Sequence, residues 1–160
     1  MTKKSVVISV IFAIIVLVIL VGVVSTSAST SSRTTRTLKE QTENDIKYNE
    51  EKINVYFFWG NGCQHCEALI SYLNTLPEEY DNYFDLYTLE VWYNEDNSKL
   101  MTELGDYLEQ EINGVPCLII GDQVFIGFRE ENKEAIKDAI KKEYNKKERY
   151  DVYKNYKEQV

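Results

Sequence analysis

Two cysteines and the only histidine of this chain share one short stretch, WGNGCQHCEAL, which runs over residues 59–69. Cys63 and Cys66 are separated by two residues, and His65 is one of them. Thiols and imidazoles can bind a metal, attach haem or, in the case of paired thiols, form a structural bridge or a redox pair. The neighbouring residues favour some of these four chemistries over the others.

Haem attachment requires a histidine directly after the second cysteine, and Glu67 stands there. A structural zinc site generally needs four ligands. A four-ligand set would have to combine Cys63 and Cys66 with Cys117 and His65. His65 lies between the paired cysteines, so its side chain is poorly placed to face the same metal as theirs. A bridge across two residues closes so small a loop that it constrains the unfolded chain little. A redox pair is therefore the leading interpretation, and metal binding remains an alternative.

A strand and a helix are expected on either side of the pair. Residues 53–59, INVYFFW, form a short apolar run that is typical of a central strand buried on both faces. Residues 60–62 predict a turn, and the apolar residues between 63 and 76 have helical spacing. A C-x-x-C pair directly after a strand and at the start of a helix favours disulfide exchange.

The start of this helix would give the two cysteines different roles. Free backbone N–H groups and the helix dipole stabilise a thiolate in the first turn. Cys63 is therefore expected to be the nucleophile or leaving thiolate, and Cys66 the more buried thiol that resolves the mixed disulfide. His65 is expected to stabilise the Cys63 thiolate, which would make the pair more oxidising; the alternative is a partly exposed residue with no role.

The rest of the chain predicts an α/β order of β-α-β-α-β-β-α. The later elements are a strand at 84–92, a helix at 97–112, two strands at 117–120 and 123–128, and a helix at 130–144. The first two strands would be parallel, joined by a crossover through the Cys63 helix, and the last two would form a hairpin. Residues 145–160 are charged and rich in tyrosine, and they predict an extension of the final helix or a tail.

WGNGCQHC and the later GVPCLIIGDQVFIGF together resemble the thioredoxin superfamily over residues 53–144. The resemblance implies a three-layer sandwich and a protein disulfide oxidoreductase that needs no cofactor. It also implies that Pro116 is cis and faces the cysteine pair, that Val115 offers its backbone to an extended substrate strand, and that Trp59 and Gln64 contact the substrate. The histidine before the second cysteine resembles secreted disulfide oxidases, whereas the short helices and hairpin resemble glutaredoxin-sized members.

The sequence departs from this family at two positions. Many members carry a buried carboxylate six residues before the first cysteine, where this chain has Phe57. Proton transfer would then use water, Glu67 or another carboxylate. Cys117 follows Pro116 directly, and we expect it to be a small buried core residue; the alternative is a third thiol near the active site.

The N-terminal residues predict a membrane anchor. Residues 5–24 contain no charge, are long enough to cross a bilayer and are longer than a usual signal-peptide core, so a retained anchor is expected. The alternative is cleavage within the small-residue segment that follows, at 25–32. Lys3 and Lys4 favour a cytoplasmic N-terminus over residues 1–4 and place the catalytic domain outside. A polar linker is expected at 25–49, followed by the thioredoxin-like domain at 50–144.

Charge excludes one class of partner. Residues 40–131 hold 20 acidic and 4 basic residues, so this domain is a poor nucleic-acid binder. The expected partners are protein thiols or disulfides, a membrane or extracytoplasmic redox partner, and the membrane itself through residues 5–24. The direction of exchange stays open, with oxidation favoured by His65. The alternative function is a metal-binding or partner-docking module on the same fold; for a peroxidase the sequence offers no signal.

Overall fold

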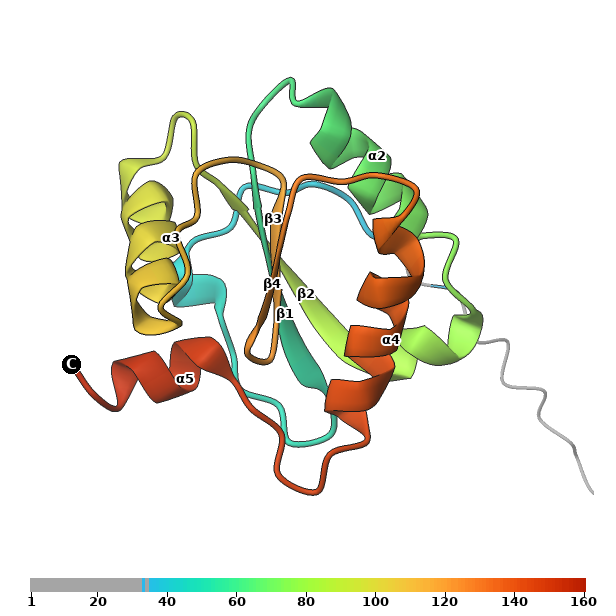
Figure 1. The fold of residues 1–160 in the computed structure, drawn as a ribbon. Helices are drawn as coiled ribbons and strands as arrows, with labels where there is room; N and C mark the ends of the chain where they lie inside the picture. The colour runs from blue at the N-terminus through green and yellow to red at the C-terminus, as the bar shows by residue number, and fades with distance from the viewer. Residues whose placement is uncertain (1–32, 34) are drawn as a thin grey trace, which may run out of the picture. The chain divides into compact units, whose positions relative to one another are not determined.

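The strand β1 (Ile53–Trp59) lies inside a four-stranded mixed sheet of order β2-β1-β3-β4 (Figure 1). The computed structural model describes residues 33 and 35–160. β1 runs parallel to β2 (Phe84–Glu90) and antiparallel to β3 (Cys117–Ile120), which forms a hairpin with β4 (Gln123–Ile126). The predicted order β-α-β-α-β-β-α is thereby confirmed.

Helices cover both faces of the sheet, as expected for a three-layer sandwich (Figure 1). The helices α2 (Gln64–Leu73) and α4 (Asn132–Tyr144) lie on one face, and α3 (Glu95–Tyr107) and α5 (Val152–Lys157) on the other. Successive side chains of β1 alternate between the two faces, as a strand requires. Val55 and Phe57 contact the α2 side, whereas Tyr56 and Phe58 contact the α3 side.

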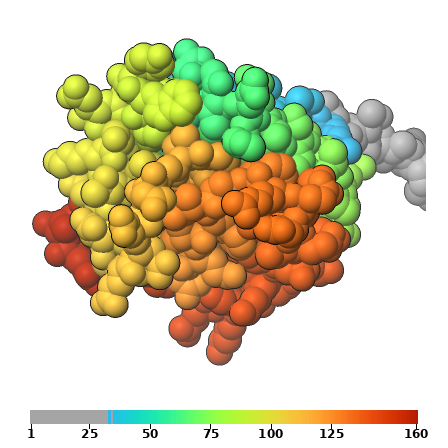
Figure 2. Space-filling view, turned by 45° about the horizontal axis from the view of Figure 1, so that its top comes forward, coloured from blue at the N-terminus to red at the C-terminus, as the bar shows by residue number. Residues whose placement is uncertain are grey.

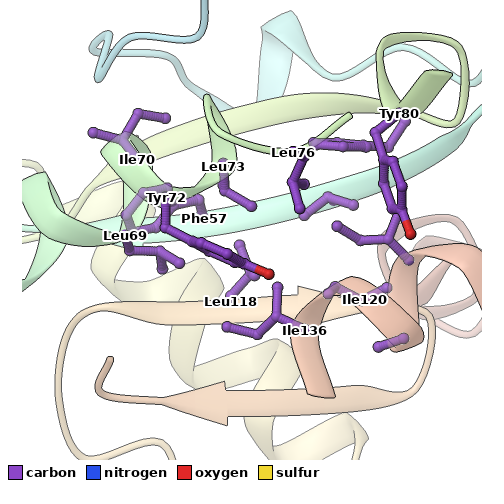
Figure 3. Packing of buried hydrophobic residues seen from close by; sticks show 14 of the residues in the cluster. Phe57, Leu69, Ile70, Tyr72, Leu73, Leu76, Tyr80, Leu118, Ile120 and Ile136 are labelled. Carbon is purple, nitrogen blue, oxygen red and sulfur yellow. The ribbon is translucent and has the colours of Figure 1, made fainter. Parts of the chain in front are cut away.

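The core between the sheet and α2 is formed by large apolar side chains (Figure 3). Phe57, Leu69 and Leu118 are fully buried there, together with Ile136 from α4. Burying a side chain of this size contributes about 1.5–3 kcal/mol relative to leaving it exposed. This packing holds α2, and with it the cysteine pair, against the end of β1.

The helix α3 ends earlier than the sequence predicts. Glu109 adopts a left-handed backbone conformation with φ of 54°, and the N–H of Gln110 donates to the carbonyl of Gly105 at 2.9 Å. This is a Schellman cap, in which a residue other than the usual glycine takes the left-handed position. Ile112 then folds back against Gly105. Residues 109–112, predicted as the last turn of the helix, lie instead in the segment that leads to β3.

The predicted membrane anchor at 5–24 and the first part of the predicted linker lie outside the described residues. Within residues 33 and 35–160, no helix combines the length and the apolar character needed to cross a bilayer. The described part of the linker is not a free spacer. The backbone N–H of Lys39 donates to the Thr88 hydroxyl in β2, and the N–H of Gln41 donates to the Thr88 carbonyl. Arg36 forms an ion pair of 2.6 Å with Asp81.

The tyrosine-rich C-terminal segment does not extend α4. The helix ends at Tyr144, and after a loop the chain forms the separate helix α5 on the opposite face of the sheet. Asp151 caps α5, and its carboxylate accepts hydrogen bonds from Tyr56 at 2.7 Å and Asn54 at 2.9 Å, both in β1. The segment predicted as an extension or tail is therefore part of the folded domain.

Candidate active site

Cys63 and Cys66 form a disulfide at the N-terminus of α2. Cys63 is the N-cap residue, and its Sγ accepts a hydrogen bond from the backbone N–H of Cys66 at 3.1 Å. The residue Cys63 has 8% of its surface exposed and Cys66 has 0%. An incoming sulfur therefore reaches Cys63 first, and the N–H that contacts Cys63 would stabilise its thiolate after reduction.

The local sequence explains how the pair is held. The N–H of Cys63 donates to the carbonyl of Gly60 at 3.0 Å, which closes a turn before the helix. Gly62 sits within this turn with φ of 86°, a conformation that side chains disfavour. The turn directs Cys63 into the first position of α2 directly after β1 ends.

Pro116 lies at the same end of the sheet as the cysteine loop. Phe58 pairs with Cys117 across β1 and β3, so Pro116 is level with the last residue of β1. The predicted cis bond between Val115 and Pro116 is confirmed. The Pro116 carbonyl accepts a hydrogen bond from Gly127 at 2.7 Å, and Val115 is half-buried between the two cores.

The other predicted site residues surround the pair in different environments. Trp59, the last residue of β1, is half-buried, and its indole Nε1 meets no acceptor among the described residues. Gln64 and His65 follow Cys63 in α2 and are exposed to solvent. Their assigned roles in substrate contact and thiolate stabilisation stay predictions. Phe57 is fully buried beneath α2, so this position supplies no proton carrier.

One buried carboxylate near this loop was not predicted from the sequence. Glu90 ends β2 with 4% of its surface exposed. Its oxygens accept N–H bonds from Asn61 in the cysteine loop, at 3.1 Å, and from three residues after β2. These three donors, at 2.9–3.2 Å, are Trp92, Tyr93 and Asn94. An acidic residue at the end of the apolar run FDLYTLEVW was the available signal.

Glu90 therefore connects the cysteine loop to the segment that enters α3. Burial acts to raise the pKa of Glu90, but the four backbone N–H donors outweigh it and hold the pKa below the ordinary value of 4.5. The Glu90 carboxylate therefore binds a proton more weakly in the folded chain than in the unfolded chain. The stabilisation by Glu90 is complete above about pH 4.5 and is lost as pH falls through the lowered pKa.

Glu90→Gln is expected to lower the free energy of unfolding by about 2–3 kcal/mol, because the amide NH₂ would face two backbone donors. Urea unfolding at pH 7 measures this loss, and Glu148→Gln at an exposed position is the matched control. The difference from wild type should shrink below about pH 4.5 as wild-type Glu90 becomes protonated. If wild type and Glu90→Gln differed in unfolding free energy as much at pH 3 as at pH 7, the ionised state assigned to Glu90 would be contradicted.

Cys117 belongs to the opposite face of the sheet. It is 0% exposed within the core formed with α3, whereas Cys66 packs in the core beneath α2. The expectation of a buried core residue is confirmed. Across the part of the chain that the structure describes, no three His, Cys, Asp or Glu side chains gather as metal ligands. Cys117 and the Cys63–Cys66 pair lie in the cores on opposite faces of the sheet.

Burial raises the pKa of the Cys117 thiol to about 12. We expect Cys117 to resist a maleimide reagent at pH 8 in the folded chain and to react fully in urea, since only the thiolate is nucleophilic. Mass spectrometry of the labelled chain measures the difference, with the Cys63–Cys66 pair left oxidised. Rapid labelling of the folded protein would show instead a third accessible thiol.

Comparisons with known proteins show a weak likeness to a solved structure. No protein-family model matches the chain, and no curated protein matches it. A solved structure of the glutaredoxin grx-1 from Archaeoglobus fulgidus is similar at 20% sequence identity, with a TM-score of 0.36 over 54% of this chain and 84% of that one. Strand order and the position of the disulfide fit a thioredoxin-like α/β domain with a C-x-x-C pair.

Proposed function

We propose that this chain is a membrane-anchored, extracytoplasmic thiol–disulfide oxidoreductase that exchanges disulfides with proteins through Cys63 and Cys66. The observation that supports it most is the disulfide at the N-cap of α2, with Cys63 partly open and Cys66 enclosed. No organic cofactor is required, because the two electrons reside in the cysteine pair.

In the oxidising direction, a substrate thiolate attacks Cys63 Sγ and the Cys63–Cys66 bond breaks. Cys66 leaves as a thiolate and takes up a proton, while the substrate is held in a mixed disulfide. A second substrate thiolate then attacks the substrate sulfur and displaces Cys63 as a thiolate, which the N–H of Cys66 stabilises. Two electrons pass from the substrate to the pair, and reduction of a substrate follows the same steps in reverse.

The remaining residues are proposed to assist this exchange. Val115 and Pro116 would hold an extended substrate strand, with Trp59 and Gln64 at its sides. His65 would stabilise the Cys63 thiolate and favour oxidation of substrates, since a nearby imidazolium lowers thiol pKa. The redox partner would be a membrane or extracytoplasmic protein that restores the pair after each cycle.

Equilibration of the full chain with graded glutathione buffers tests both the activity and its direction. A reduction potential near about −120 mV would make the chain a disulfide donor, and one near about −270 mV a reductase. A pair that never equilibrates with glutathione would contradict the proposed function.

The proposed location is tested separately. Recovery of the chain in membranes after an alkaline wash, with its domain open to protease added outside the cell, would support it.

A further inference from the structure

Two exposed aromatic residues stand beside the cysteine loop. Trp92 is 54% exposed and Tyr93 is 80% exposed, although large aromatic rings are usually buried. A Cβ added at Gly60 would overlap the Trp92 indole, so this ring lies directly on the loop that leads to Cys63. Figure 2 shows the surface of α2 and the surface of the segment before α3 side by side on one face.

The backbone beneath these rings is fixed. The N–H groups of Trp92 and Tyr93 donate to Glu90 at 3.0 and 2.9 Å, and the same carboxylate holds Asn61. Asn94 then caps α3 by accepting a hydrogen bond from Asn97 at 3.0 Å. The two rings are therefore presented to solvent from a segment held at both ends, which reduces the entropy lost when a ligand binds.

The surroundings of the rings are acidic. Glu95 and Asp96 follow them in the first turn of α3, and Glu67 is exposed in the first turn of α2. Neither residues 60–70 nor residues 91–98 contain a lysine or arginine. An aromatic face with an acidic rim attracts a cationic side chain through both cation–π and charge interactions.

We propose that Trp92 and Tyr93 form a recognition surface for a lysine or arginine that neighbours the reacting cysteine of a substrate protein. This inference rests on the proposed function and names a substrate preference for it. The cationic side chain would lie over the rings with its charge toward Glu95 and Asp96, while the adjacent substrate sulfur reaches Cys63.

Three reduced two-cysteine peptides that differ only in one flanking residue, Arg, Gln or Glu, test the preference. The second-order rate constant for reduction of the oxidised full chain is measured with each. Each rate is divided by the rate of the same peptide with glutathione disulfide, which removes the effect of the flanking charge on thiol reactivity. We expect the normalised rate to be about tenfold higher for Arg than for Glu at low salt, with a smaller ratio at 1 M salt.

Tyr93→Ala and Trp92→Phe are expected to reduce the Arg-to-Glu ratio, Tyr93→Ala to about twofold. Tyr48→Ala is the matched control, because Tyr48 is an exposed aromatic residue that precedes the opposite end of β1. Equal normalised rates for all three peptides would overturn the recognition surface while leaving disulfide exchange intact. No reaction with any peptide would overturn both proposals.

Discussion

Cys63→Ser is expected to lower the rate of protein disulfide exchange by more than about 10³-fold, because it removes the sulfur that substrates reach and the Cys63–Cys66 disulfide that accepts their electrons. The structure gives this residue the partly exposed side of the disulfide and the N-cap position of α2, where the Cys66 N–H contacts its Sγ at 3.1 Å. The rate at which the oxidised chain forms disulfides in a reduced, unfolded protein is the measurement. Exchange near the wild-type rate would show that the Cys63–Cys66 disulfide does not carry the activity.

Two companion variants separate this chemistry from a general loss of structure. Cys66→Ser should retain the Cys63 nucleophile but lose the resolving thiol. Given a substrate protein that carries a disulfide, its Cys63 thiolate should attack that bond and release one substrate thiolate, and the mixed disulfide between Cys63 and the substrate should accumulate on non-reducing gels. Cys117→Ala is the matched control, because this thiol is buried on the other face of the sheet and should leave exchange unchanged. A mixed disulfide formed through Cys117 would contradict the assignment of roles.

The parts of this protein that could be predicted from sequence are those fixed by local patterns. The run INVYFFW becomes the central strand β1 because a strand covered on both faces buries apolar side chains of either orientation, and six of its seven residues, all but Asn54, are apolar. The C-x-x-C pair opens α2 because a tight turn connects it to that strand. Cys117 is buried because it begins β3, whose four residues are all buried.

The features that could not be predicted depend on contacts between distant residues. Asp151 and Tyr56 are 95 residues apart, and no pattern in the tyrosine-rich tail indicates that it returns to the central strand. Thr88 in β2 forms hydrogen bonds with residues 39 and 41, which lie at least 47 positions earlier in the sequence. Glu90 accepts hydrogen bonds from four backbone N–H groups that lie in two separate loops. Its acidic side chain alone therefore did not indicate that it connects these loops.

Asp151→Ala is expected to lower the free energy of unfolding by about 2–4 kcal/mol. The change leaves the Tyr56 hydroxyl without an acceptor inside the core, at about 1–3 kcal/mol, and removes the N-cap of α5, at about 1 kcal/mol. Burial, followed by the charge and hydrogen bond of Asp151, raises the pKa of Tyr56, so the hydroxyl stays a proton donor at neutral pH. Urea unfolding followed by circular dichroism measures the loss.

A double-mutant cycle distinguishes this hydrogen bond from loss of helix α5 alone. Tyr56→Phe in the Asp151→Ala background removes the unpaired hydroxyl, so the double variant should be less destabilised than the sum of the single variants by about 1–2 kcal/mol. Asp138→Ala, at an exposed position of α4, should change stability by less than about 0.5 kcal/mol. Strict additivity of the two changes would mean that Asp151 acts only as a cap, and that α5 is held to the sheet by Val152 and the tyrosines instead.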